Sequence, residues 1–239
     1  MSVSKLKRCF FIPDSHVPYE SKAAFGLMLR AGRSFRPDVV VILGDFADFY
    51  AVSSHSKSPD RSGDLEYEVN CVKERLAQVA ALGAKRNIFV AGNHEDRLQR
   101  YVNERAPELF GCVKIPRLLG LDELGFQYVP YKTSFRLGKL WITHDLGKAG
   151  ANAHRAASSD YRGSCAIGHT HRMEYSVSGC VEGPPAVGAM FGWLGDFGSV
   201  DYMHAAKAKR EWVHGFGTGF MESNGVIHLQ PVPIVSGRC

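Results

Sequence analysis

The sequence predicts an α/β fold in which a second β-sheet packs on a first, and three observations carry that prediction. Apolar runs of strand length alternate with amphipathic helical segments over the first half of the chain. The first two runs flank one such segment, a pattern typical of a β-α-β crossover between parallel strands. Beyond residue 171 the chain changes to short β-type pieces, and the last two flank Asn224-Gly225, a strong two-residue hairpin signal.

Three continuous apolar runs in the first half are predicted strands. They cover residues 8–12, 39–43 and 87–91. The run 39–43 is apolar throughout, as expected where a strand is buried on both faces. Two amphipathic segments, residues 21–35 and 64–82, place their apolar residues on one side and are predicted to be helices that cover the sheet. A third helical pattern, residues 96–102, follows the third strand.

The second half is predicted from shorter signals. Residues 107–130 mix glycines and prolines with short apolar pieces, which indicates a compact connector with a little strand. Residues 134–143 have the pattern of a hairpin that turns at Gly138, and residues 165–167 follow as a short strand. Four later β-type pieces, which we expect to form the second sheet, cover residues 174–177, 186–190, 219–223 and 226–231.

The composition bounds the class of protein. With 239 residues, 45% apolar, and no Pro/Ser-rich linker, the chain can bury one substantial core, so we expect a single domain over residues 1–239. Six well-separated cysteines without a C-x-x-C pair argue against a disulfide scaffold or a thiolate zinc site, and favour a reducing compartment. We expect no signal peptide and no membrane span. The net charge of +5 favours anionic partners.

Side chains typical of metal ligands follow five of the predicted strands. The central block is Gly92-Asn93-His94-Glu95, which presents an amide, an imidazole and a carboxylate side by side where the run 87–91 ends. In open α/β sheets, ligands bind at the carboxyl ends of strands. The other four strand ends carry Asp14-Ser15-His16, Gly44-Asp45-Phe46-Ala47-Asp48, His144 and Gly168-His169-Thr170-His171. One such histidine alone would indicate a structural residue, but five blocks in succession predict a metal site.

The ordered set D-x-H, G-D-x-x-D, G-N-H-E, a lone His and G-H-T-H resembles the motifs of the calcineurin-like metallophosphoesterases over residues 14–171. The resemblance implies a β-sandwich of two mixed sheets flanked by helices. It also implies a hydrolase that uses two divalent metal ions to cleave phosphoesters. The single compact domain and the GNHEDR run at residues 92–97 are similar to members encoded by tailed bacteriophages and prophages, which implies the cytoplasm of a bacterial host.

The resemblance implies seven metal ligands divided between two ions. They are Asp14, His16 and His171 for one ion, Asn93, His144 and His169 for the other, and Asp45 as the bridge. Carboxylate, imidazole and carboxamide donors without sulfur suit borderline-hard divalent ions, so we expect Mn²⁺ first, with Fe²⁺, Ni²⁺ or Zn²⁺ as alternatives. Two such ions against two carboxylates leave about two excess positive charges, which favours a phosphate ligand.

The resemblance also implies the reacting groups. A hydroxide that bridges the two ions would be the nucleophile, and His94 would protonate the departing oxygen. Asp48 would hold the tautomer of His94 and raise its pKa. Phe49 stands where the protein phosphatases of the family usually have a phosphate-binding arginine, while the G-H-T-H block belongs to the broader phosphodiesterase and nuclease branches.

Polar segments beside the ligands are predicted to form the rim of the site. Residues 46–63 follow Asp45 directly, and residues 145–163 follow His144 and end in a short helix. The candidates for substrate binding are Arg97, His55, Lys57 and Arg61, with Lys148 and Arg155 as further candidates from the second segment. For Arg97, an ordinary exposed arginine is the alternative.

Several other residues are predicted to be structural. We expect Glu95 to interact with the N-terminus of its helix, and Trp193 and Trp212 to pack in the core rather than to stack on a base. The basic run at residues 205–210 is predicted as a solvated helix face, with a nucleic-acid patch as the alternative. Five histidines lack metal-type context and are predicted to be surface or core residues: His55, His154, His204, His214 and His228. The run Gly192-Trp193-Leu194-Gly195-Asp196 has no predicted function.

The predicted function is hydrolysis of a phosphoester, more specifically of a phosphodiester in a nucleotide or nucleic acid. The alternatives are a phosphomonoesterase of the protein serine/threonine phosphatase type, a cyclic-nucleotide phosphodiesterase, and a catalytically weak metal-binding scaffold. The scaffold alternative is disfavoured because no predicted ligand is missing. The sequence indicates no oligomeric state.

Overall fold

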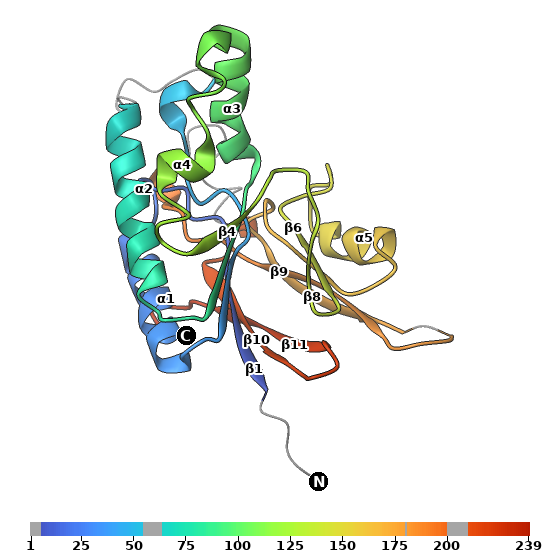
Figure 1. The fold of residues 1–239 in the computed structure, drawn as a ribbon. Helices are drawn as coiled ribbons and strands as arrows, with labels where there is room; N and C mark the ends of the chain where they lie inside the picture. Colours follow the sequence, from blue (N-terminus) through green and yellow to red (C-terminus); the bar gives the residue numbers. More distant parts are fainter. Residues whose placement is uncertain (1–5, 55–63, 180, 200–209) are drawn as a thin grey trace.

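The computed structural model describes residues 6–54, 64–179, 181–199 and 210–239, and it has two mixed β-sheets packed face to face with helices outside (Figure 1). The first sheet has the order β11-β10-β1-β2-β3-β4. Its strands are β1 Lys7–Ile12, β2 Val39–Ile42, β3 Arg86–Val90, β4 Phe126–Val129, β10 Gly215–Met221 and β11 Ile227–Pro233. β1 to β4 run parallel, and β10 and β11 add an antiparallel hairpin beside β1.

The second sheet has the order β5-β6-β7-β9-β8. Its strands are β5 Phe135–Leu137, β6 Leu140–Thr143, β7 Cys165–Ile167, β8 Met173–Ser178 and β9 Ala186–Phe191. The helices are α1 Lys22–Phe35, α2 Leu65–Ala80, α3 Asn93–Arg105, α4 Ile115–Leu119 and α5 Ala153–Asp160, with single 3-10 turns η1 Tyr50–Val52, η2 Pro107–Leu109 and η3 Phe197–Ser199. Among the described residues, no helix combines the length and apolar character that a membrane crossing needs.

Alternate residues of β1 show how the layers are built. Phe10 and Ile12 face the apolar sides of α1 to α4, whereas Cys9 and Phe11 face the second sheet. Phe11 stacks on Phe191 of β9 at 5.2 Å between ring centroids. A third apolar cluster joins α5 to the outer side of β7 and β9. The period of two in each strand therefore buries the first sheet on both faces, as its apolar runs predict.

The predicted α/β sandwich and most of its elements are confirmed. The helix starts follow from capping: Asp64 accepts hydrogen bonds from the backbone N–H groups of Glu66 and Tyr67 at 2.9 and 3.3 Å. The connector prediction misses α4, a five-residue helix that Gly120 ends at φ 65°. The prediction that all four late strands form the second sheet is wrong, because β10 and β11 join the first sheet beside β1.

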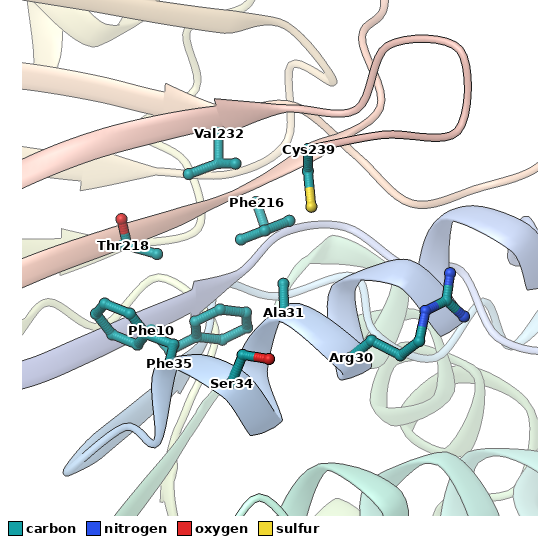
Figure 2. A pocket seen from close by; sticks show the side chains of 9 residues that line it. All are labelled: Phe10, Arg30, Ala31, Ser34, Phe35, Phe216, Thr218, Val232 and Cys239. Atoms are coloured by element: carbon teal, nitrogen blue, oxygen red, sulfur yellow. The ribbon is translucent and has the colours of Figure 1, made fainter.

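A mostly apolar groove of about 550 Å³ lies between α1 and the β10–β11 hairpin (Figure 2). Phe10, Phe35 and Phe216 meet there, with Phe10 5.1 Å from Phe216 between ring centroids. Phe10 is four residues before Asp14 on β1. The groove is therefore on the helix side of the first sheet, away from the strand end that carries the candidate ligands.

Candidate metal centre

The carboxyl ends of strands from both sheets carry the predicted ligands. β1, β2 and β3 are parallel neighbours in the first sheet, and β6 and β7 are parallel neighbours in the second. The segments after these strands hold Asp14, His16, Asp45, Asn93, His144, His169 and His171. The fold brings these side chains together across as many as 155 residues of sequence.

The first cluster consists of Asp14, His16 and His171, all buried. His16 Nε2 lies 3.0 Å from His171 Nε2, and His171 Nε2 lies 3.2 Å from Asp14 Oδ2. Each imidazole ring thus turns a nitrogen toward the other ring, and a carboxylate oxygen lies beside them. These three atoms are donors that a shared cation would satisfy.

The second cluster consists of Asp45, Asn93, His144 and His169. Asn93 Oδ1 lies 3.0 Å from His144 Nε2 and 2.9 Å from His169 Nδ1. Asp45 Oδ2 lies 3.3 Å from the same His144 nitrogen. Asp45, His144 and His169 place their ligand atoms within 4.8 Å of one another. One carboxylate, one amide oxygen and two imidazoles therefore converge here.

The spacings within both clusters fit divalent cations. Neighbouring ligands of an octahedral ion with bonds of ~2.1 Å are about 3.0 Å apart. The His16–His171 and Asn93–His169 contacts, at 3.0 and 2.9 Å, match that separation. Nitrogen and oxygen donors without sulfur suit borderline-hard ions. The residues present could therefore hold a metal ion in each cluster.

Four of the seven candidate ligands have a left-handed backbone. Their φ angles are 52° for His16, 47° for Asp45, 69° for His169 and 58° for His171. This conformation is unfavourable for residues with a Cβ atom and recurs at functional sites, where the surrounding structure enforces it. The strained backbone after these strands thus directs the four side chains toward the two clusters.

The clusters contain strongly interacting charges. Burial alone would raise the pKa of Asp45, but the imidazoles of His144 and His94 outweigh it and hold that pKa well below its usual range. Burial opposes the charged form of His144, yet the Asp45 and Asp14 carboxylates raise its pKa to about 10. Burial lowers the pKa of His171 to about 4. The neighbouring imidazoles thus favour the charged form of Asp45, which is the form that binds a cation.

His94 and Asp48 lie together, as predicted, but the carboxylate has a second partner. His94 Nδ1 is 3.0 Å from the backbone oxygen of Asp48 and 3.5 Å from its Oδ2. The same Oδ2 is 3.1 Å from Nδ1 of His16. Burial opposes a charge on His94, but Asp45 and Asp48 raise its pKa. Asp48 therefore orients a candidate ligand as well as the candidate acid.

Arg97 is beside His94 rather than in solvent. Its side chain is 13% exposed, with Nη1 3.1 Å from the backbone oxygen of Asp48 and Nη2 3.3 Å from His94 Nε2. Phe49 is fully buried in the core that α1 to α4 share with the first sheet. Arg97 thus supplies a cation next to the candidate acid, whereas the buried Phe49 supplies none.

Two of the other predicted rim residues, Lys148 and Arg155, lie away from the clusters, and three lie outside the described residues. His55, Lys57 and Arg61 lie outside the described residues. Lys148 forms an exposed ion pair with Asp160, and Arg155 is exposed on α5. Within the described ranges, neither of these two cations forms a hydrogen bond or ion pair with a candidate ligand. Residues 205–209 and His204 also lie outside the described part.

Glu95 does more than interact with its helix. Its buried carboxylate accepts hydrogen bonds from the backbone N–H groups of Gly92, Ala47 and Asp45, at 2.7, 2.8 and 3.0 Å. A Cβ atom on Gly92 would lie 2.2 Å from Asp45 Oδ1, so the two loops approach this closely only with glycine there. Sequence reasoning missed this contact because its partners are as many as 50 residues away.

The two late tryptophans pack as predicted, and their neighbours include a candidate ligand. Trp193 and Trp212 are 3% and 7% exposed, and both rings contact the imidazole of His171. Such burial leaves neither indole face open to a base. Of the remaining histidines, His154 is buried, while His228 is paired with Glu222 on the surface.

Comparison with known proteins places the chain in a family. Residues 7–173 match the family model described as calcineurin-like phosphoesterase. The gene 54 proteins of Mycobacterium phages D29 and L5 are each 25% identical over 97% of this chain and 95% of their own length. Among solved structures, the phosphoesterase YfcE of E. coli is 16% identical over 94% of this chain and 99% of its own, with a TM-score of 0.42. Vacuolar protein sorting 29 of Cryptosporidium parvum is 13% identical over 94% of this chain and 96% of its own, with a TM-score of 0.46.

Proposed function

The chain belongs to the calcineurin-like phosphoesterase family and is a metal-dependent phosphoester hydrolase, and from this premise we propose that it is a dinuclear phosphodiesterase acting on nucleotides or nucleic acid. The observation that supports this most is the pair of clusters beside His94 and Arg97. Phosphoryl transfer needs metal ions, a proton donor and a cation that binds phosphate. In this proposal the clusters would hold the ions, His94 would be the proton donor and Arg97 would be the cation.

In this proposal Asp14, His16 and His171 would hold one ion, and Asn93, His144 and His169 would hold the other, with Asp45 as the proposed shared ligand. When bound, the ions supply Lewis acidity that lowers the pKa of water and stabilises charge on the phosphoryl oxygens. The chain's own ligands fix where the phosphate lies. Glu95 supports this by fixing the backbone of Asp45, since its carboxylate accepts from the Asp45 N–H at 3.0 Å.

His94 is the proposed general acid. Its Nδ1 donates to the backbone oxygen of Asp48, so Nε2 is the nitrogen left to face a substrate. Asp45 and Asp48 favour the protonated ring. A bound phosphate would compete for the Arg97 guanidinium, whose Nη2 donates to Nε2 at 3.3 Å, and Nε2 would then carry the proton that the departing oxygen receives.

Arg97 is the proposed contact to a phosphoryl oxygen. Its Nη2 is 3.3 Å from His94 Nε2, so its remaining N–H groups lie next to the place where the leaving oxygen would be. Among the described residues, Arg97 is the one Lys or Arg within hydrogen-bonding distance of His94. This cation fits the negative charge of a phosphodiester, and Phe49 leaves no arginine at the position where the protein phosphatases of the family usually bind phosphate.

The test is a panel of substrates with Mn²⁺ supplied. We expect hydrolysis of bis-p-nitrophenyl phosphate and of single- or double-stranded DNA or cyclic nucleotides to exceed hydrolysis of p-nitrophenyl phosphate. Asn93→Ala should abolish turnover, while Asn103→Ala, on an exposed position of the same helix, should not. A clear preference for the monoester would instead support the phosphatase alternative. Two bound ions without turnover on any member of the panel would support the scaffold alternative.

A further inference from the structure

Trp193 and Trp212, called here the tryptophan clamp, enclose the imidazole of His171. The Trp193 ring stacks on it, with 4.9 Å between centroids and 15° between planes. The Trp212 ring meets it edge-on at 4.2 Å and 85°. The two indoles also contact each other at 4.8 Å. The imidazole is thus confined on two sides by large rigid rings.

His171 lacks the usual means of orienting a ligand. A metal-binding histidine generally donates its second ring N–H to a carboxylate or a carbonyl oxygen, which fixes the ring and its tautomer. Nδ1 of His16 has Asp48 Oδ2 at 3.1 Å, and Nδ1 of His144 has the backbone oxygen of Leu43 at 2.8 Å. Nδ1 of His171 is buried and has no hydrogen-bond partner in the described part of the chain. Something else must hold this ring.

The backbone holds the clamp rigidly against the first cluster. The N–H of Trp193 donates to Val213 at 3.0 Å, and the N–H of Val213 donates to the backbone oxygen of His171 at 3.1 Å. The N–H of Leu194 donates to the backbone oxygen of Asp14 at 2.7 Å. A Cβ atom on Gly195 would lie 2.1 Å from the Trp193 ring, so a glycine is needed for the indole to fit.

We propose that Trp193 and Trp212 are positioning residues for His171, which hold its Nε2 toward Asp14 and His16 by ring contact in place of a hydrogen bond. This rests on the proposed metal site. The proposal also gives a function to the run at residues 192–196. Trp193 of this run packs on the ligand His171, and the backbone N–H of Leu194 holds the backbone of the ligand Asp14. Metal affinity at the first cluster should then depend on the indoles, and affinity at the second cluster should not.

The test is titration of the metal-free protein with Mn²⁺, followed by EPR of the free ion and by calorimetry. Trp193→Leu should weaken one of two binding events by about 10-fold or more, the usual effect of losing a residue that orients a ligand. Trp193→Phe should weaken the same event less. This variant deletes an indole N–H that is buried and has no hydrogen-bond partner among the described residues, so its effect reports ring contact rather than a lost hydrogen bond.

Trp141→Phe is the matched control, because Trp141 stacks on Tyr161 in the second sheet and contacts neither indole of the clamp. Near-UV circular dichroism checks that each variant is folded. If Trp193→Leu does not fold, Trp193→Phe and Trp212→Phe replace it, and each should weaken the same one of the two binding events. In a His171→Ala background, the clamp substitutions should have no further effect on the metal that remains.

Three results separate the proposals. If the wild-type chain binds a single ion, the proposed dinuclear function fails. If it binds two ions and the clamp variants bind both as tightly, the clamp has no positioning function. An equal loss at both sites, or a further loss in the His171→Ala background, would show that the indoles support the fold generally, and this also contradicts the proposal.

Discussion

Asp48 offers one carboxylate to two histidines, and this sharing decides how substitutions here should behave. Its Oδ2 is 3.1 Å from His16 Nδ1 and 3.5 Å from His94 Nδ1. From the sequence we expect Asp48 to serve His94 alone. The structure adds a candidate ligand to its partners, so its removal should affect metal binding as well as proton donation.

The first prediction contrasts His94→Ala with Asp48→Asn. His94→Ala should keep both ions and lose about 10²–10⁴-fold in kcat on diesters with basic alcohol leaving groups, because nothing else protonates them. The loss should be much smaller with p-nitrophenolate, which departs without a proton. Asp48→Asn should show a weaker form of this pattern together with weaker binding of one ion. Elemental analysis and kcat on both substrate types check this, and loss of a metal from His94→Ala would contradict the assignment.

The second prediction concerns Arg97. Arg97→Ala should lower kcat/KM for diesters by about 10–100-fold, since a charge-assisted phosphate contact contributes roughly 1.5–3 kcal/mol. Arg100→Ala is the control, because Arg100 is on the same helix, is 56% exposed and pairs with Asp96. Steady-state kinetics of the two variants decide the point. Equal kinetics for both would remove Arg97 from the substrate site.

The third prediction concerns Glu68 and pH. Burial raises the pKa of Glu68 from 4.5 to about 7, and its side chain accepts from the backbone N–H of Ala51 at 2.9 Å. Between pH 4.5 and about pH 7 the folded chain keeps a proton on Glu68 that the unfolded chain has released. The free energy of unfolding therefore falls as the pH rises through this range. The fall should total about 3 kcal/mol and be complete above pH 7.

Glu68→Gln should therefore be more stable than the wild type at pH 8 and similar to it at pH 4.5, as measured by urea denaturation. Glu66→Gln, which changes an exposed carboxylate in the same helical turn, should show no such pH dependence. A pH-independent difference between Glu68→Gln and the wild type would mean that Glu68 is ionised in the fold throughout this range.

At the scale of elements, the start of α2 is fixed by its N-cap residue, Asp64. Asp64 Oδ1 accepts from two backbone N–H groups, at 2.9 and 3.3 Å, whereas Ser21 at the start of α1 accepts one at 3.4 Å. Asp64→Ala should lower the free energy of unfolding by about 1 kcal/mol. Ser21→Ala should lower it less. Denaturant titration at neutral pH measures both, and the reverse order would show that packing rather than capping fixes these ends.

The elements that could be predicted from sequence are those with local signals. Continuous apolar runs indicate β1, β2 and β3, and amphipathic periods with caps indicate α1 and α2. α4 could not be predicted, because five residues with an early proline make too short a period. The sheet that β10 joins could not be predicted either, since it depends on pairing with β1 more than 200 residues earlier, such as Lys7 with Met221.

At the scale of the whole molecule, two sheets present parallel strand ends to one place. This is why the candidate ligands could be predicted: each follows an apolar run, and parallel runs end at one edge. Three other features of the site could not be predicted from the sequence: the Glu95 hydrogen bonds, the second partner of Asp48 and the tryptophan clamp. Each is a side-chain contact between segments far apart in sequence, and no local pattern marks it.

The fifth prediction is that metal ions stabilise the fold as a whole. Ions that bind only the folded chain should add about 2.7 kcal/mol per site at a concentration of 100 Kd. Mn²⁺ should therefore raise Tm, chelation should lower it, and Asp45→Ala should abolish most of the difference. Differential scanning calorimetry with and without chelator measures this. An unchanged Tm would show that the clusters do not bind the ion.

The left-handed backbone at His16, Asp45, His169 and His171 also bears on how such a protein can evolve. Four such residues oppose folding by about 4 kcal/mol together, a large share of the roughly 5–15 kcal/mol that keeps a domain folded. Descendants that keep the fold but abandon the chemistry should drift to glycine or asparagine at these positions, and at the partly buried His169 before the buried His171, whose ring packs between Trp193 and Trp212.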